Sequence, residues 1–189
     1  MKLIRTVVVA ALMFFAFTPA HAGKMAKAKG PMVVSPDKAT IVFMRPGKFV
    51  GAAIAVPVFE VTGGETRFVG IVDAGGKLAY PVSPGKHIFM TTVFGGDTGV
   101  RFEEADVEAG KVYYFRAHII NNLWGLEPVR GSELAGKDFM HWDEKTRLIE
   151  NSPKSLAWGE ENLADAKRKS GLKPAEIPEQ FTLHTADGR

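Results

Sequence analysis

The sequence has no cysteine among its 189 residues, and this absence excludes several kinds of chemistry. The chain can form neither a disulfide nor a thiolate metal site, and it has no thiol nucleophile. It also cannot carry the lipid anchor of a bacterial lipoprotein, because that anchor is attached to a cysteine at the cleavage site. Its stability must come from packing alone, and the chain is long enough to bury the core of one domain.

Common catalytic and nucleotide-binding motifs are also missing. The sequence has no Gly-x-Ser-x-Gly elbow, no His-x-His pair and no His-Glu-x-x-His motif. Its glycine-rich stretch at residues 95–99 lacks the lysine and the strand-to-helix setting of a phosphate-binding loop. We therefore predict no catalytic residue, no cofactor and no enzyme activity.

The first 22 residues contain the three parts of a cleavable signal peptide. Lys2 and Arg5 give a positive start, residues 7–17 form an uncharged apolar run, and small residues precede a cleavage site after Ala22. The apolar run has about half of the ~20 residues that a membrane-spanning helix needs, and no other stretch is long enough. We expect an exported protein, most readily periplasmic or else secreted, with no transmembrane span after cleavage.

The net charge argues against binding to nucleic acid. The chain has 24 Lys and Arg residues against 21 Asp and Glu residues, and two of the basic ones would leave with the signal peptide. The remaining protein would be almost neutral and would have no basic stripe of the kind that binds nucleic acid. Its one basic cluster is Lys24, Lys27 and Lys29, in residues 23–37. We expect a flexible segment there, with weak attraction to anionic lipid or cell-wall polymer as the alternative.

Between residues 38 and 130, short apolar segments alternate with turns rich in glycine and proline. None of these segments has the 3.6-residue period of an amphipathic helix, and short apolar runs between turns are typical of β-strands. The strands expected from the pattern are Ala39–Arg45, Ala53–Val61, Thr66–Asp73, Lys77–Val82, Lys86–Phe94, Val100–Val107 and Val112–Ile120, with a further one at Leu126–Arg130. So many short strands in succession predict an antiparallel β-sandwich domain over residues 38–130.

Residues 107–113 have the spacing of a tyrosine corner. In that motif a tyrosine hydroxyl bonds to the backbone across the loop that enters its strand, and Gly110 would form the turn before Tyr113. Because side chains alternate along a strand, Tyr113 would face inward, whereas Tyr114 and His118 would face the other way. We predict a structural role for Gly110 and Tyr113.

Residues 131–189 form a C-terminal extension of different character. A serine and a proline open one clear helix, about residues 153–170, and Gly171 follows it as a stop signal. Leu156 belongs to the modest apolar stripe of this helix, which we expect to face the sandwich. From Leu172 onward we expect an extended or frayed terminus.

The densest group of polar side chains lies at residues 138–144, where one histidine lies among three carboxylates. His141, Asp143 and Glu144 are weak candidates for a metal site or an acid–base site. A hydrolase that uses this group is therefore the alternative to a protein without enzyme activity. Local sequence alone does not make such side chains converge, and acidic stretches are common on solvated surfaces.

Two further histidines lie on expected strands. His87 follows the turn formed by Pro84 and Gly85, and we expect its side chain to pack or to bond a loop carbonyl. Pro84 and Gly85 themselves have a structural role in that turn. His118 would join a polar patch on the outer face of its strand.

A second alternative is a glycan-binding module, and it depends on whether three tryptophans are exposed. Exposed tryptophans on an exported sandwich can stack on sugar rings, whereas buried ones belong to the core. The residues concerned are Trp124, Trp142 and Trp158. Trp124 lies between Leu123 and Leu126, which favours a place in the core.

Three stretches of turn and strand resemble a family of bacterial envelope domains of unknown function. They are Ile-Val-Phe-Met-Arg-Pro-Gly at 41–47, Leu-Ala-Tyr-Pro-Val-Ser-Pro-Gly-Lys-His at 78–87 and Ala-Gly-Lys-Val-Tyr-Tyr at 109–114. The family has recurring Arg-Pro-Gly, Pro-Gly-x-His and Ala-Gly-Lys-x-Tyr-Tyr motifs. The resemblance covers about residues 37 to 130 and implies a small sandwich of immunoglobulin or transthyretin type, often lipid-anchored, with no assigned activity. This chain differs by its missing lipidation cysteine and its longer helical extension.

The leading interpretation of the whole sequence is a non-enzymatic exported β-sandwich. Its role would be to bind or support another component of the cell envelope, either a protein or a cell-wall glycan. The export signal, the strand pattern and the missing active-site motifs favour this interpretation.

Overall fold

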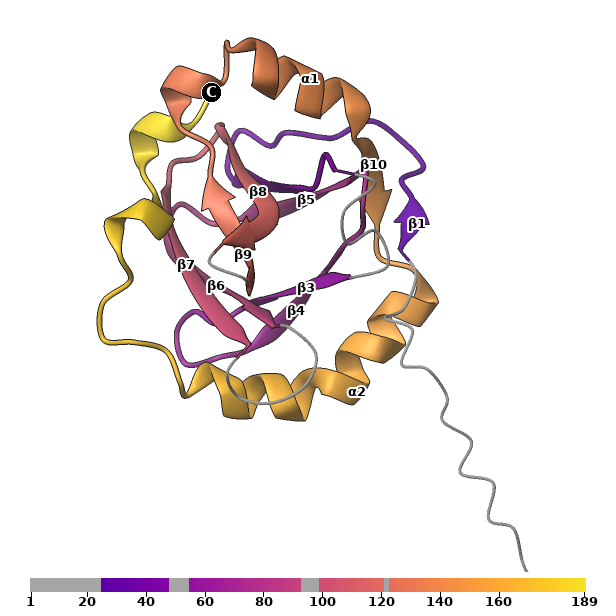
Figure 1. The fold of residues 1–189 in the computed structure, drawn as a ribbon, viewed down its shortest axis with the longest axis vertical. Helices are drawn as coiled ribbons and strands as arrows, with labels where there is room; N and C mark the ends of the chain where they lie inside the picture. Colours follow the sequence, from indigo (N-terminus) through magenta and orange to yellow (C-terminus); the bar gives the residue numbers. More distant parts are fainter. Residues whose placement is uncertain (1–24, 48–54, 93–98, 121–122) are drawn as a thin grey trace, which may run out of the picture.

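The computed structural model describes residues 25–47, 55–92, 99–120 and 123–189, which form a mainly β fold of two sheets (Figure 1). Sheet A has the strand order β1-β10-β5-β2-β8-β9, and sheet B has the order β11-β7-β6-β3-β4. The strands are Ala26–Lys27 (β1), Ala39–Met44 (β2), Val56–Glu60 (β3), Arg67–Val72 (β4), Gly76–Val82 (β5), Gly85–Thr92 (β6), Val100–Val107 (β7), Val112–Ile120 (β8), Leu123–Pro128 (β9), Arg147–Glu150 (β10) and Thr182–Leu183 (β11). The α-helices are Lys137–Lys145 (α1) and Pro153–Ser170 (α2), and the 3-10 turns are Gly131–Glu133 (η1), Glu179–Phe181 (η2) and Thr185–Asp187 (η3).

All seven strands predicted between residues 39 and 120 are present as β2 to β8. The ends of two predictions, at residues 53–54 and 93–94, lie outside the described residues. The further strand expected at Leu126–Arg130 forms as β9, which begins and ends earlier, at Leu123 and Pro128.

The prediction of a purely antiparallel sandwich is wrong, because both sheets are mixed. β2 pairs in parallel with β8, β10 in parallel with β5, and β11 in parallel with β7. A parallel pair needs a long connection, and here each pair joins strands that lie far apart in the sequence. Alternation and turns predict where a strand lies and which way its side chains face, but not the direction of its neighbour.

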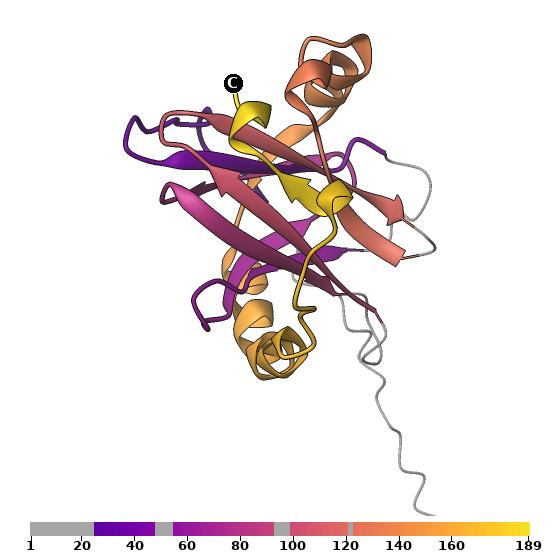
Figure 2. The same ribbon diagram turned by 90° about the vertical axis from the view of Figure 1, so that its left-hand side faces the viewer.

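Side chains from both sheets form the main core. Phe43 on β2 stacks on Phe115 of β8 with 5.8 Å between ring centroids, and Phe89 on β6 of the other sheet contacts Phe43 at 5.1 Å. The sheets therefore pack face to face as two layers (Figure 2). A second cluster covers the outer face of sheet A and consists of Val42, Met44, Val112, Tyr114, Val129, Leu134 and Phe139.

Tyr113 lies in the main core and Tyr114 in the second cluster, as the alternation along β8 predicts. The Tyr113 hydroxyl accepts a hydrogen bond of 2.9 Å from the backbone N–H of Glu108, across the loop that enters β8. Gly110 has a φ of +76° in this loop, a conformation that favours glycine. This is the geometry of a tyrosine corner.

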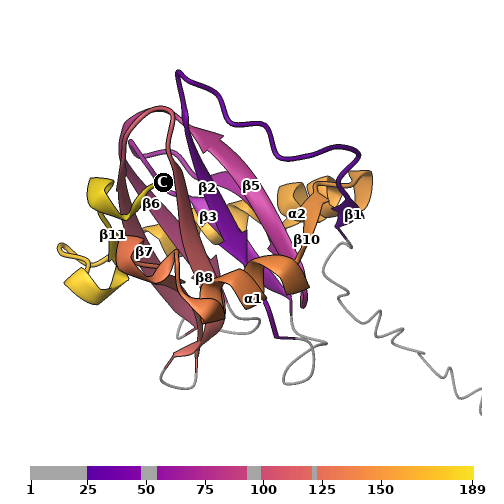
Figure 3. The same cartoon turned by 90° about the horizontal axis from the view of Figure 1, so that it is seen from above.

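The two α-helices cover opposite sides of the sheets (Figures 1 and 3). α1 lies over sheet A, where the Phe139 ring is 4.8 Å from the ring of Tyr114. α2 has the bounds that the sequence predicted and packs on β4 of sheet B, where Trp158 lies 5.8 Å from Phe68. The expected apolar stripe is wrong in detail, because Leu156 is 48 % exposed and the face with Trp158 is buried instead.

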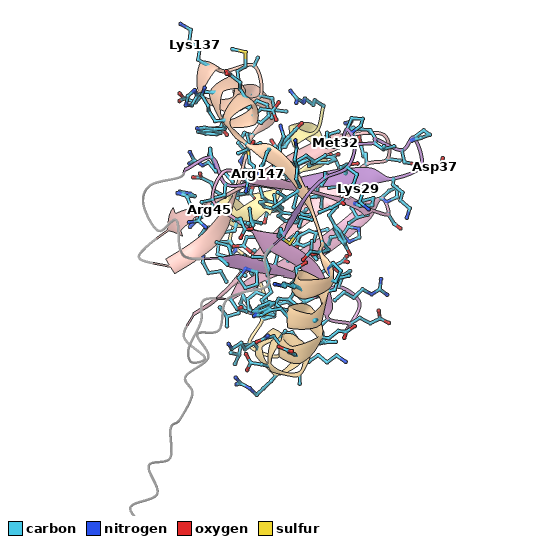
Figure 4. The ribbon with its side chains drawn as sticks, turned by 90° about the vertical axis from the view of Figure 1, so that its right-hand side faces the viewer. Lys29, Met32, Asp37, Arg45, Lys137 and Arg147 are labelled. Carbon is cyan, nitrogen blue, oxygen red and sulfur yellow. The ribbon has the colours of Figure 1, made fainter. Side chains whose placement is uncertain are left out.

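Both ends of the described chain are held more firmly than the sequence suggested. In the segment expected to be flexible, Met25 is buried and Ala26–Lys27 pairs with β10. Figure 4 labels Lys29, Met32 and Asp37 along the part of the chain between β1 and β2. The expectation of a frayed terminus is wrong for residues 179–189, which form η2, β11 and η3. None of the helices among the described residues has the length and apolar character needed to cross a membrane.

Candidate functional site

The predicted cluster at residues 138–144 does not converge into one site. It forms α1, where successive side chains point about 100° apart around the axis. His141 and Glu144 are exposed, whereas Asp143 turns toward sheet A and forms an ion pair of 2.5 Å with Lys77. Among the described residues, no three His, Asp or Glu side chains come close enough together to hold a metal ion.

The described tryptophans are engaged within the protein. Trp158 is 8 % exposed and packs between Phe59 and Phe68 in the main core. Trp142 lies under Arg116, whose guanidinium carbon is 4.3 Å from the ring centroid. The side chain of Trp124 lies outside the described residues.

His118 lies on the outer face of sheet A, in the polar patch that the sequence suggested. Its Nε2 atom is 3.0 Å from Glu127 Oε2, without the geometry of a hydrogen bond, and Glu127 also pairs with Arg116. Burial lowers the pKa of His118. Because Arg116 already neutralises the carboxylate, this group has the character of a surface ion pair.

A different cluster joins three strands at one end of the sandwich. Glu60 ends β3, Tyr80 lies on β5 and His87 lies near the start of β6. His87 Nδ1 is 2.6 Å from Glu60 Oε1, and the Tyr80 hydroxyl donates a 2.8 Å hydrogen bond to Glu60 Oε2. The side chains of His87 and Glu60 are 12 % and 10 % exposed, so water weakens their interaction little.

The hydrogen bonds of His87 define its charge. Its Nε2 atom is 2.8 Å from the backbone carbonyl of Ser83, a group that can only accept, and its Nδ1 atom faces the carboxylate of Glu60. Both ring nitrogens must carry hydrogen to satisfy both acceptors, which makes the ring an imidazolium. The bond to Glu60 accordingly raises the pKa of His87, and the same bond lowers the pKa of Glu60.

Tyr80 is equally committed to the cluster. Burial and the hydrogen bond to Glu60 raise the pKa of its hydroxyl above the ordinary value, so the phenol stays neutral. The geometry therefore holds the charges of Glu60 and His87 in place.

A surface pocket opens beside this cluster. It has a volume of about 190 Å³ and is lined by Glu60, Thr62, Glu65, Arg67 and His87. Glu65 also lines an adjoining hollow of about 500 Å³, together with Gly64, Thr66, Lys167 and Ser170. Charges of both signs and hydroxyl groups thus line two hollows that share Glu65, between the β3–β4 turn and the end of α2. We call these two hollows together the depression.

The sequence pointed to only part of this site. His87 bonds a loop carbonyl, as expected of a histidine after the Pro84-Gly85 turn, and Gly85 has a φ of +115° there. Glu60 and Tyr80 were not singled out. A signal was present for Glu60, because a carboxylate within the apolar run Val-Phe-Glu-Val must have a buried partner when it faces the core.

A second buried carboxyl lies between the sheets. Glu103 on β7 is fully buried, and its Oε1 atom accepts a 3.0 Å hydrogen bond from the backbone N–H of Leu126 on β9. Burial raises its pKa to about 8. Within the described residues its Oε2 atom has no hydrogen-bond partner.

No protein-family model matches this chain, and no curated protein matches its sequence.

Proposed function

We propose that this protein is an exported, non-enzymatic binding protein of the cell envelope and that the depression beside Glu60 and His87 is its binding site. The observation that carries the proposal is the closed set of hydrogen bonds between Glu60, Tyr80, His87 and the Ser83 carbonyl. Groups that satisfy one another in this way form a rigid polar wall. Such a wall suits recognition better than catalysis.

The rim of the depression suggests the chemistry of the ligand. Glu65 and Arg67 form an exposed ion pair, with side chains 64 % and 66 % exposed, and Lys167 lies across the adjoining hollow. Exposed pairs of this kind are weak, so a ligand can replace one partner at little cost. A polar ligand with hydroxyl or charged groups, such as a segment of cell-wall glycan or a polar loop of an envelope protein, fits this rim.

The fold and the compartment belong to the same proposal. Two facing sheets, the tyrosine corner and the Arg-Pro-Gly, Pro-Gly-x-His and Ala-Gly-Lys-x-Tyr-Tyr motifs support a sandwich related to the immunoglobulin or transthyretin type and to the envelope family that the sequence resembles. The signal-peptide pattern of residues 1–22 supports export. Fractionation of cells that express the full chain should place the protein outside the cytoplasm, with an N-terminus at Gly23.

The binding site is tested with variants of its rim. Purified residues 23–189 would be cross-linked to envelope fractions and, separately, sedimented with purified cell-wall glycan. The variant Glu65→Ala/Arg67→Ala should lose at least about tenfold in affinity, because it removes both polar groups at the mouth. The control Glu144→Ala/Lys145→Ala removes an exposed pair on α1 and should bind as the parent does. Equal binding by both variants, or turnover of a substrate by the parent protein, would refute the proposal.

A further inference from the structure

The segment that follows α2 consists of two parts with different surroundings. Residues 171–176 are exposed, and within the described chain their hydrogen bonds go to the end of α2 or to the segment itself. A hollow of about 370 Å³ lies between this stretch and β7, lined by Val100, Arg101, Phe102, Leu172, Pro174, Pro178 and Phe181. We call residues 171–178 the linker, and it bows away from the body at the left of Figure 1.

Residues 179–189, which we call the strap, are in contrast bound closely to the body. β11 extends sheet B by parallel pairing of Thr182 with Glu104 and of Leu183 with Ala105. Leu183 is fully buried in the main core. Arg189 then forms two backbone hydrogen bonds, of 2.8 and 3.1 Å, with Val112 at the start of β8.

Polar side chains clamp the strap at its middle. Arg130 donates hydrogen bonds to the backbone carbonyls of Thr182 and Glu179 and pairs with Asp187 at 3.1 Å. The other oxygen of Asp187 accepts from the backbone N–H of Gly131. Because Asp187 is only 8 % exposed, this clamp requires an aspartate at that position and an arginine opposite it.

The partners of the strap lie in the two sheets, in the turn after β9 and, for the Arg189 side chain, on Phe139 of α1. Apart from bonds within the strap and to Pro178, its hydrogen bonds go to β7, to the loop before β8, to β8 and to residues 130–131. Within the described chain, none of these hydrogen bonds goes to α2. The groove therefore recognises the sequence of the strap, whichever chain supplies it. An edge strand that accepts an extended segment by backbone pairing is a common recognition mode.

We propose that the edge of β7, together with the Arg130 clamp, is a strand-addition site that can accept the strap of a second copy of this chain, so that two copies exchange their straps. After exchange, each strap makes the same contacts as before, but with the groove of the other copy. The short linker keeps the effective concentration of the chain's own strap in the millimolar range. The parent protein is consequently a monomer at micromolar concentration, and exchange appears when the strap is prevented from binding its own groove.

Charge reversal tests the exchange in the full chain. Arg130→Asp and Asp187→Arg each place like charges in the clamp of a single chain. In a mixture, exchange restores an opposite pair at both clamps, because the reversed groove meets the reversed strap and the native groove meets the native strap. We expect each variant alone to remain monomeric and the mixture to give a heterodimer of twice the mass by native mass spectrometry. A mixture of folded variants that stays monomeric would overturn the proposal.

Two further samples guard against variants that fail to fold. The control mixture of Glu144→Lys with Lys145→Glu reverses an exposed pair on α1 and should remain monomeric. Deletion of residues 172–177 leaves two residues between α2 and the strap, which span at most about 11 Å. That variant should form a dimer with protected amides on β7 and β11. A monomer at 100 micromolar, with the strap either bound or released, would equally contradict strap exchange.

Discussion

The carboxyl group of Glu103 on β7 and the backbone N–H of Leu126 on β9 meet at 3.0 Å across the two sheets. Val129 N–H bonds Tyr114 in the same antiparallel β8–β9 ladder, and this register turns the N–H of Leu126 away from β8. A buried acid thus satisfies a backbone donor on the free edge of sheet A.

Burial of Glu103 should make the stability of the protein depend on pH, and one substitution can isolate this effect. Its pKa of about 8 in the folded protein is raised above the unfolded value, so its contribution to stability is complete below about pH 4 and is lost as the pH rises to 8. Glu103→Gln keeps the acceptor and cannot ionise. We expect the variant to gain on the order of 1 kcal/mol per pH unit relative to the parent between pH 5 and 8 in urea unfolding. Parallel pH curves for the two proteins would contradict this.

The pair of His87 and Glu60 should stabilise the fold within a limited pH range, because the two residues lose their contributions at opposite ends of it. The raised pKa of His87 means that its contribution is present below the unfolded value and is lost as the pH rises through the folded one. The lowered pKa of Glu60 makes its contribution disappear as the pH falls through the folded value. The pair is therefore most stabilising between about pH 4.5 and 6.5.

His87→Gln should destabilise the protein by about 1.5–3 kcal/mol at pH 6, because it removes a hydrogen bond between charged groups. The loss should shrink toward pH 9. Nitrogen chemical shifts should also show an imidazolium at His87 above pH 6.5. The matched control is His184→Gln, which removes an exposed contact with Glu179 and should change stability by less than about 0.5 kcal/mol. A His87 ring that is neutral at pH 6 would disprove the assigned charge.

Substitution of Gly159 by alanine should destabilise the protein, although this residue lies within a helix. A Cβ atom at this position would lie 2.4 Å from the ring of Phe68, so the contact between α2 and β4 must open to admit it. We expect Gly159→Ala to lose about 1–3 kcal/mol by overpacking, although alanine favours a helix by about 1 kcal/mol. The comparison is Ala164→Gly on the exposed side, which should cost about 1 kcal/mol through propensity alone. Thermal unfolding of the two variants measures both effects, and a Gly159→Ala protein more stable than the parent would show that the helix moves freely.

The hydrolase alternative makes a prediction about α1. His141 is exposed and Asp143 is paired with Lys77, so His141→Ala and Glu144→Ala should each change stability by less than about 0.5 kcal/mol. Metal analysis of the purified protein should give the same content for the parent and for both variants. A metal content that falls with either substitution would restore the site at residues 138–144.

Strand positions and turns were predictable here because they depend on local sequence. Pro84, Gly85 and Gly110 punctuate the chain, and Tyr113 faces the core because its strand alternates. The parallel pairing of β2 with β8 was not predictable, since it depends on contacts between distant segments. Local patterns carry little information about such pairs.

The candidate site shows the same division. His87 could be placed at a turn from its neighbours, whereas its partnership with Glu60 and Tyr80 arises only when β3, β5 and β6 come together. The strap was missed for a similar reason. Its residues include few large apolar side chains, and Leu183 is buried because sheet B supplies an edge for it.

The parallel pairs also have a consequence for how the chain acquires its structure. β10 completes the connection of β1 to sheet A, and β11 closes the edge of sheet B, yet both lie in the last quarter of the sequence. Both sheets therefore need strands from distant parts of the sequence to be complete. High contact order of this kind slows folding. We therefore expect the pairings of β10 and β11 to form late in folding.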